Sequence, residues 1–221
     1  PEGSPVLFVR VGITNPHDYE TPMYWWSNIA VPETHETRDI APADFAFRFG
    51  YKGHGLGRIP VPTMDGIDVS YPTHLDHAAD FFFHIPEGRY PWITALDAQG
   101  RGLIQTSTRQ LKGRKLFLWG MGAGGRKWQE FLSLPGRAYI EIQAGLAHTQ
   151  MEHLPMPAGA RWCWVEAYGL LEADADIVHG SSWSAAQAIV EQGLAKLIPA
   201  ALLETELEQS SAWADTPPLE I

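Results

Sequence analysis

The chain has 221 residues, a hydrophobic content of 45% and a formal net charge of −10 at pH 7, so it is long enough for one sizeable domain with a core. The acidic balance argues against a nucleic-acid partner, because nucleic-acid-binding proteins present concentrated basic patches to phosphates. No run of about 18 apolar residues occurs, so we expect no membrane span. Cys163 is the only cysteine, which excludes an intrachain disulfide and favours a reducing, cytoplasmic compartment.

The aromatic and turn-forming residues depart most from an average composition. The chain contains nine Trp, seven Tyr and nine Phe, together with 17 Pro and 21 Gly. Many aromatic residues among many turn formers are typical of a β-rich fold with short connections. Exposed Trp and Tyr rings also suit the apolar faces of sugars.

Strand-like segments separated by turn residues follow one another along the first 180 residues. Strands are expected at 5–13, 23–31, 37–47 with a break at Pro42, 80–85, 92–96, 102–108, 115–119, 161–168 and in the first half of 136–157. We expect the segments 102–108 and 115–119 to pair across the turn at Gly113. The regular spacing of short strands predicts an all-β sandwich or barrel.

The C-terminal part of the chain has a helical pattern instead. From Ser182 the apolar residues recur at helical spacing, Pro199 interrupts the pattern, and 200–209 resumes it as a second helix. We therefore divide the chain into a β domain at 1–180 and a helical extension at 181–221.

The stretch Gly136 to Pro157, GRAYIEIQAGLAHTQMEHLPMP, is the strongest candidate for a functional site. Strand alternation puts Glu141 and Gln143 on one face, which is either a solvated edge or the floor of a polar site. Burial would raise the pKa of Glu141 and suit it to act as a general base near neutral pH. The alternative is a structural ion pair between Glu141 and a basic residue, for which the candidates are Arg114, Lys115 and Arg126.

Other kinds of chemistry lack a supporting motif. The run from His148 to His153 does not have the spacing of a zinc protease motif, and His74 with His77 would need a third ligand from elsewhere, so we expect no metal. The Gly-rich loop 50–62, which contains His54, lacks the phosphate-binding patterns and is interpreted as a lid or a connection, and no cofactor is expected. Cys163 lies between two tryptophans in a strand, where a packed, inert thiol is expected.

Several long runs, in the same order along the chain, carry a family resemblance. They are MYWWSNIAVPE at 23–33, DVSYP at 68–72, STRQLKGRKLFLWG at 107–120 and WQEFLSLPGRAYIEIQAGLAHTQMEHLPMP at 128–157. Together they resemble a bacterial family of uncharacterised domains found ahead of tetratricopeptide repeats, over about residues 9–180. That family is related to the galactose mutarotase-like supersandwich, the fold of aldose 1-epimerases. The resemblance implies a mainly β, antiparallel supersandwich, incomplete at its N-terminus, followed by C-terminal α-helices that begin a repeat array.

The resemblance also implies roles for individual residues. Glu141 and Gln143 look like the E-x-Q strand whose Glu is the mutarotase general base. Asp68 resembles the Asp that holds sugar hydroxyls, with Asp65 a nearby rival. The segment 24–31 is similar to the strand that bears the catalytic acid, but mutarotases have a His there and this chain has Tyr24, Trp25 and Trp26.

These observations lead to the hypothesis of a carbohydrate-binding domain, with epimerase or glycosidase chemistry at Glu141 as its catalytic form. Asp68 would orient hydroxyls, and a second acid would come from His77, Glu152 or His54. Sugar contacts are expected from Asn28, Gln143, Arg114, His148 and Glu152, and stacking surfaces from Trp25, Trp26 and Trp119. The alternative is a non-catalytic module that recognises a glycan or a protein, with a protein partner bound through the helical C-terminus.

Overall fold

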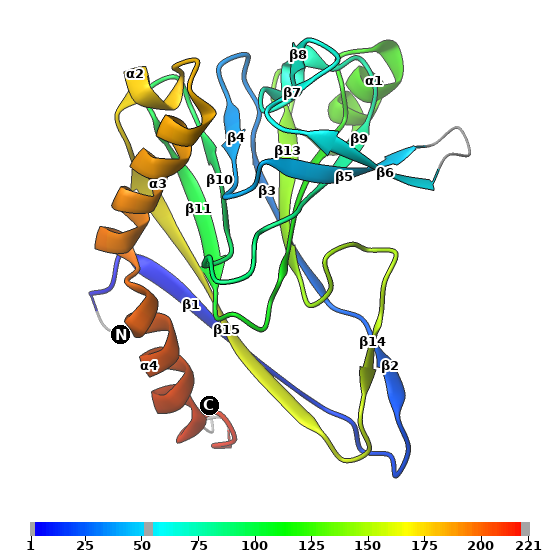
Figure 1. Cartoon of the computed structure of the whole chain (residues 1–221), viewed down its shortest axis with the longest axis vertical. Helices are drawn as coiled ribbons and strands as arrows, with labels where there is room; N and C mark the ends of the chain where they lie inside the picture. The colour runs from blue at the N-terminus through cyan, green and yellow to red at the C-terminus, as the bar shows by residue number, and fades with distance from the viewer. Residues whose placement is uncertain (1–2, 51–54, 218–221) are drawn as a thin grey trace.

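Two antiparallel β-sheets packed face to face form the body of the molecule (Figure 1). The computed structural model describes residues 3–50 and 55–217. Within them, the five-stranded sheet has the order β1 (Val6–Thr14), β15 (Arg161–Glu172), β11 (Arg101–Ser107), β10 (Trp92–Leu96) and β4 (Arg38–Ile40). The six-stranded sheet has the order β3 (Trp26–Pro32), β13 (Tyr139–Gly145), β12 (Gly113–Leu118), β9 (Ala79–Phe83), β5 (Phe45–Gly50) and β6 (Gly55–Pro60). The predicted antiparallel sandwich is confirmed.

Two small two-stranded sheets and four helices complete the described chain. One sheet pairs β2 (Thr21–Met23) with β14 (Leu154–Met156), and the other is a hairpin of β7 (Thr63–Met64) and β8 (Ile67–Asp68). The helices are α1 (Ala123–Leu132), α2 (Ala175–Val178), α3 (Trp183–Leu197) and α4 (Ala200–Ser211), with a 3₁₀ turn at Pro72–His74.

The two-residue period of the strands decides which side chains fill the space between the sheets. On β13, Ile140 and Ile142 are buried in the main apolar core, whereas Glu141 and Gln143 belong to the opposite face. On β12, Leu116 joins the same core. The six-stranded sheet therefore has an inner face that packs on the five-stranded sheet and an outer face that carries the Glu-x-Gln pair.

A few buried polar side chains join the two sheets. The hydroxyl of Ser27 donates to Glu166 Oε2 at 2.5 Å, and the Tyr168 hydroxyl donates to the same oxygen at 2.8 Å. Arg114 donates from Nη2 to Ser107 Oγ at 2.6 Å. Burial lowers the pKa of the Arg114 guanidinium to about 10, while burial followed by the charge of Glu166 raises the pKa of Tyr168. These hydrogen bonds join polar side chains of the two sheets within the space between them.

Three expectations about the strands are corrected by the topology. The segments 102–108 and 115–119 do not pair, because β11 pairs with β10 and β15 while β12 pairs with β9 and β13 in the other sheet. The expected strand 37–47 is two strands, and the chain changes sheets at Pro42, between β4 and β5. The expected strand 23–31 divides between β2 and β3, and Met23 belongs to the separate two-stranded sheet of β2 and β14.

The C-terminal helices lie along the five-stranded sheet (Figure 1). Helix α3 begins after Ser182, whose hydroxyl accepts from the Ala185 amide at 3.3 Å as an N-cap. Trp183 packs into the core and donates from Nε1 to the Ala43 carbonyl at 2.8 Å. The two predicted helices and the break at Pro199 are confirmed, and the division of the chain at residue 180 stays a prediction. Across the described residues, none of the helices is long and apolar enough to cross a membrane.

The outer face has one close approach that only glycine permits. A Cβ atom on Gly145 would lie 2.3 Å from the ring of Trp26, and one on Gly113 would lie 2.2 Å from the Ala147 carbonyl oxygen and 2.7 Å from the same ring. We predict that Gly145→Ala displaces Trp26 and lowers the free energy of unfolding by about 1–3 kcal/mol, measured by urea titration. The matched control is Gly57→Ala on β6, where a Cβ would meet nothing closer than 4.0 Å. Equal stability of the two variants would contradict the packing described for Trp26.

Candidate functional site

A carboxylate held by two side-chain amides lies on the outer face of the six-stranded sheet, on the strand next to its β3 edge. Asn28 Nδ2 donates to Glu141 Oε2 at 2.7 Å, and Gln143 Nε2 donates to the same oxygen at 3.0 Å. The arrangement follows from the strand register, because Gln143 on β13 lies directly opposite Asn28 on β3. Asn28 is exposed and Glu141 is half-buried. The carboxylate is thus oriented by neutral donors and remains open to solvent.

The network continues from Glu141 across the sheet. Gln143 Oε1 accepts from Gln150 Nε2 at 2.8 Å, and Gln150 Oε1 accepts from Lys115 Nζ at 2.7 Å. Lys115 on β12 also forms an ion pair with Asp80 on β9, with Nζ and Oδ1 2.6 Å apart. The resulting chain of polar groups, which we call the polar network, runs from β3 to β9 and consists of Asn28, Glu141, Gln143, Gln150, Lys115 and Asp80.

Aromatic rings border the polar network on both sides. Phe117 on β12 lies directly opposite Glu141, and its ring meets that of Trp119 edge to face with centroids 4.8 Å apart. On the other side, the rings of Phe82 and Trp26 meet with centroids 5.9 Å apart. The Lys115 ammonium lies 5.4 Å from the Phe82 centroid and 5.5 Å from that of Phe117. Phe82 is 1% exposed, so the ring surface beside the network comes from the half-buried Trp26, Phe117 and Trp119.

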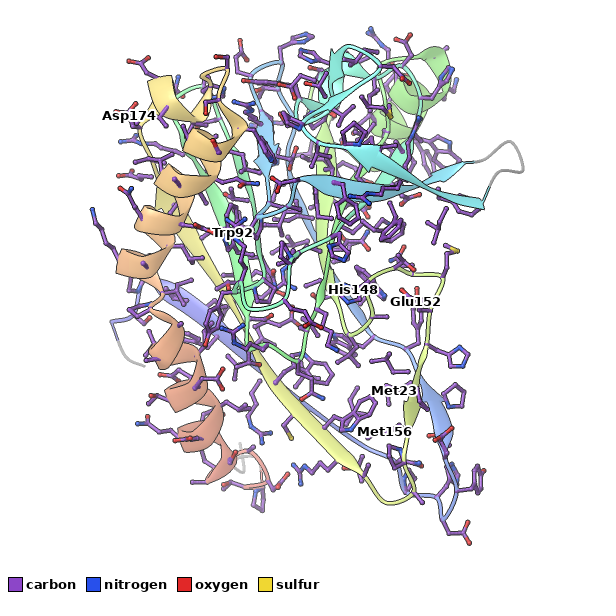
Figure 2. The ribbon with its side chains drawn as sticks, in the orientation of Figure 1. Met23, Trp92, His148, Glu152, Met156 and Asp174 are labelled. Carbon is purple, nitrogen blue, oxygen red and sulfur yellow. The ribbon has the colours of Figure 1, made fainter. Side chains whose placement is uncertain are left out.

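The loop between β13 and β14 forms one rim of this face (Figure 2). Gln150 reaches from it into the polar network, whereas Glu152 is exposed and accepts from the Thr149 amide at 2.9 Å and the Thr149 hydroxyl at 2.8 Å. His148 stacks on His84 with ring centroids 5.7 Å apart. Burial, followed by the charge of His84, lowers the pKa of His148. Glu152 therefore shapes the loop, and His148 packs beside the network without bonding to Glu141.

Several residues expected at the site lie elsewhere. Arg114 is fully buried on the inner face, where its guanidinium bonds to Ser107 and to backbone carbonyls, so it cannot contact a ligand on the outer face. Trp25 also packs inward, edge to face on Trp164 with centroids 5.5 Å apart. Neither Arg114 nor Lys115 is an ion-pair partner of Glu141; Lys115 reaches it only through the two glutamines.

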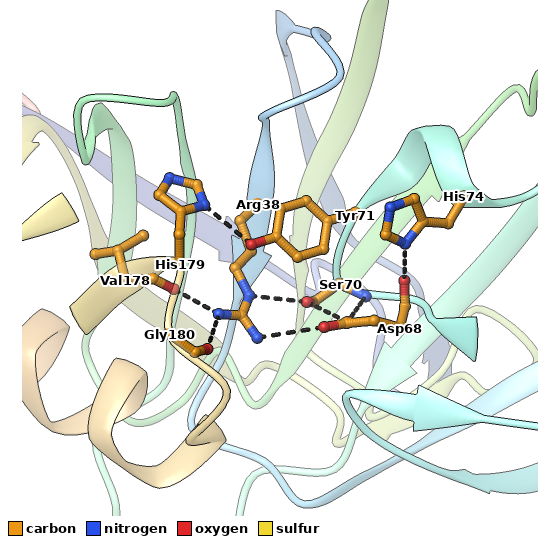
Figure 3. Close-up of polar contacts among 8 residues, drawn as sticks. All are labelled: Arg38, Asp68, Ser70, Tyr71, His74, Val178, His179 and Gly180. Carbon is orange, nitrogen blue, oxygen red and sulfur yellow. Dashed lines mark hydrogen bonds and ion pairs between the residues drawn. The ribbon is translucent and has the colours of Figure 1, made fainter. Parts of the chain in front are cut away.

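Asp68 belongs to a separate polar cluster around Arg38 (Figure 3). The Arg38 guanidinium is 2% exposed, donates to Ser70 Oγ at 3.0 Å and to the Gly180 carbonyl at 2.9 Å, and forms an ion pair with Asp68 at 3.4 Å. The Ser70 hydroxyl and amide donate to the other oxygen of Asp68. The Tyr71 ring lies 5.1 Å beneath the guanidinium carbon. This cluster joins β4, the turn after β8 and the chain that enters α3.

The histidine candidates for a second acid are also dispersed. His77 is exposed in the turn that packs against Gly120, and His74 bonds through Nδ1 to the Asp68 carbonyl at 2.9 Å. His54 lies outside the described residues. The part of the chain that the structure describes contains no group of three or more His, Cys, Asp or Glu side chains placed to hold a metal ion.

Sequence reasoning misses a second carboxyl group, Glu33, which follows β3. Glu33 lines a pocket of about 540 Å³ beside α1, and its Oε2 accepts from Gln129 Nε2 at 3.0 Å. Burial raises the pKa of Glu33 to about 7. Asp39 is fully buried, neither of its carboxyl oxygens has a partner among the described residues, and burial followed by the charge of Glu33 raises its pKa. No local pattern marks either residue, because distant segments bury them.

The sequence did contain a signal for the missed members of the polar network. In DFFFHI, Asp80 and Phe82 share a face, and in KLFLW, Lys115 and Phe117 do. In the sheet, these residues share one face with Glu141 and Gln143, because β12 pairs with both β13 and β9. Gln150, by contrast, lies in the loop between β13 and β14. The alternation of side chains along a strand does not predict where a loop residue points.

Comparisons with known proteins define the fold and the family. The fold is the galactose mutarotase-like sandwich. A candidate aldose 1-epimerase from Escherichia coli K12 matches with a TM-score of 0.55 at 12% identity, over 76% of this chain and 56% of its own. A candidate aldose 1-epimerase from Klebsiella pneumoniae matches with a TM-score of 0.51 at 19% identity, over 88% of this chain and 48% of its own. A TPR-domain containing protein from Parabacteroides distasonis matches with a TM-score of 0.63 at 22% identity, over 76% of this chain and 28% of its own. No curated protein matches the chain.

The chain belongs to the family described as Domain of unknown function (DUF5107), whose model matches residues 3–158. That range contains the whole polar network, the Arg38 cluster up to Tyr71 and helix α1. The chain spans about half or less of the length of the solved structures named above.

The partners of Asp68 predict a structural effect of its removal. We expect Asp68→Asn to lower the free energy of unfolding by about 1–3 kcal/mol, because it leaves the buried Arg38 guanidinium without its counter-charge. Urea titration followed by fluorescence measures the change. Asp65→Asn is the control, because Asp65 is exposed at a φ of 51°, a backbone conformation that Asn tolerates. An Asp68→Asn variant as stable as the unsubstituted protein would show that Asp68 does not stabilise the Arg38 cluster.

The raised pKa of Glu33 predicts a pH-dependent stability. Between the usual pKa of 4.5 and about 7, the folded chain keeps a proton on Glu33 that the unfolded chain has released, so stability falls as pH rises through that window. Glu33→Gln removes the ionisable group, and we expect it to match the unsubstituted protein near pH 4.5 and to exceed its stability by about 1 kcal/mol at pH 8. Urea titrations at a series of pH values measure this, with exposed Glu36→Gln as control. A slope as steep in Glu33→Gln as in the unsubstituted protein would refute the assignment, because buried Asp39, whose pKa is also raised, adds a slope of its own to both.

Proposed function

We propose that the outer face of the six-stranded sheet binds a sugar or glycan, with Glu141 as the central acceptor for its hydroxyl groups. The observation that carries this proposal is a solvent-accessible carboxylate, held by Asn28 and Gln143, directly beside the aromatic ring of Phe117. Sugars present hydroxyl groups at their edges and apolar C–H groups on their faces. A site for them therefore needs fixed polar groups and an aromatic surface in the same place.

The charges of the polar network favour a neutral sugar. Lys115 is ion-paired with Asp80 at 2.6 Å, so its ammonium is already neutralised. Glu141 has only amide donors among the described residues. The network therefore carries one net negative charge, which would repel an acidic sugar such as a uronate and leave neutral sugars as the preferred ligands.

The surroundings of Glu141 favour binding over chemistry. Epimerisation or glycosidic cleavage needs an acid across the sugar from the base. The described side chains bonded to Glu141 are both amides, which cannot transfer a proton, and both donate to Oε2. Asp68 is engaged with Arg38 and Glu152 with Thr149. Recognition of a sugar without turnover is therefore the form of the proposal to test first.

The test is a titration of glucose, galactose, mannose, N-acetylglucosamine and glucuronate into the protein by calorimetry. We expect a neutral sugar to bind, glucuronate to bind more weakly, and Glu141→Gln to lower the affinity for the neutral sugar by about tenfold or more, because the charged acceptor is lost. The matched control is Glu208→Gln, an exposed glutamate on α4. An affinity unchanged in Glu141→Gln, with its thermal unfolding also unchanged, would sink the proposal.

The same samples distinguish binding from catalysis. Anomer exchange of the bound sugar is followed by NMR line shapes at increasing protein concentration. A rate that rises with the protein and falls in Glu141→Gln would assign Glu141 as a base, whereas binding at the uncatalysed exchange rate would assign it as a recognition residue.

A further inference from the structure

A row of aromatic rings leads away from Glu141 and onto helix α1. Phe117 meets Trp119 edge to face at 4.8 Å between centroids, Trp119 stacks on Trp128 at 5.9 Å, and Trp128 meets Phe131 at 6.1 Å. We call these four residues the aromatic row. Its first two rings belong to β12 and the residue after it, and its last two to α1.

The aromatic row is continuous with the polar network. Its first ring, Phe117, lies directly opposite Glu141 in the strand register, and Tyr139, two residues before Glu141 on the same face of β13, meets Trp119 at 6.1 Å. A ligand that contacts Glu141 and extends beyond the ring of Phe117 therefore meets further rings.

The outer end of the row is unusually open to solvent. Trp128 is 51% exposed although one face of its ring stacks on Trp119, and Phe131 is 76% exposed. The adjacent Gln129 is buried and holds the Tyr139 backbone, so α1 is anchored to the sheet by a polar side chain and presents its aromatic residues outward. Large apolar side chains gathered on a surface mark a binding site more often than scattered ones do.

We propose that the aromatic row is a set of subsites for a glycan chain, so that the ligand of this face is an oligosaccharide or polysaccharide rather than a single sugar. This inference rests on the proposed sugar site at Glu141. One sugar unit would occupy the polar network, and further units would lie along the row with their C–H faces against the rings. A polymer fits rings that contact one another in succession from Phe117 to Phe131, and neutral units are expected because the site at Glu141 favours a neutral sugar.

A ladder of neutral glycans tests the proposal. The probes are glucose and galactose, together with malto-, cello- and galacto-oligosaccharides of two, four and six units, titrated by calorimetry into the full chain. We expect the dissociation constant to fall about tenfold or more between the single sugar and the tetramer, because each ring added to the contact contributes stacking. Trp128→Ala should abolish that gain while changing the affinity for the single sugar less than twofold.

Two further variants keep the test decisive. Phe131→Ala should reduce the gain in the same direction, and Trp213→Ala, which removes a tryptophan that is 62% exposed after α4, should leave the whole ladder unchanged. Thermal unfolding confirms that each variant is folded.

The outcomes separate this inference from the function on which it rests. Equal affinity for one unit and four units, or a gain that survives in Trp128→Ala, overturns the subsites while leaving the sugar site at Glu141 intact. Loss of single-sugar binding in Trp128→Ala also overturns them, because the row would then belong to the first site. If instead Trp128→Ala shifts the sedimentation of the protein and the ladder is flat, the row is a protein interface and the proposal is wrong.

Discussion

The constraint on which the rest of the structure depends is the pleat of the six-stranded sheet. Because successive side chains alternate between faces, the same seven residues of β13 fill the core with Ile140 and Ile142 and build the site with Glu141 and Gln143. A shift of one residue would bury the carboxylate and expose the isoleucines, so the core itself fixes the register that joins Gln143 to Asn28. One alternation therefore produces both the packed core and the candidate site.

Sequence reasoning predicted the elements better than their partners. Periodicity located β10, α3 and the Glu-x-Gln face, because these depend on the residues of one segment. Pairing depends on the path of the chain between segments: β11 and β12 are close in sequence, yet Gly113 begins a strand of the other sheet. The prediction of Arg114 as a sugar contact fails for a different reason: it is adjacent to Lys115 on β12, so strand alternation alone puts the two side chains on opposite faces.

Sequence and structure differ most for residues whose side-chain partners are distant in the chain. Asp68 lies in a motif that resembles a sugar-binding aspartate, but its neighbour in space is Arg38, thirty positions away, whose guanidinium is buried by Trp183 and by the carbonyls at the start of α3. Glu33 owes its environment to Gln129 on α1. Neither environment can be predicted from the neighbouring sequence. A motif can therefore resemble that of a known family although the residue has different contacts in the structure.

Gln150 gives the polar network an internal competitor. Its amide already bonds to Gln143, which itself donates to Glu141, and to Lys115. A ligand that reaches them must exchange those bonds for its own, so the net gain is the difference between two similar sets of hydrogen bonds, each worth about 1 kcal/mol. Under the proposed function, a ligand that enters the network therefore gains only as much as its own hydrogen bonds exceed those of Gln150.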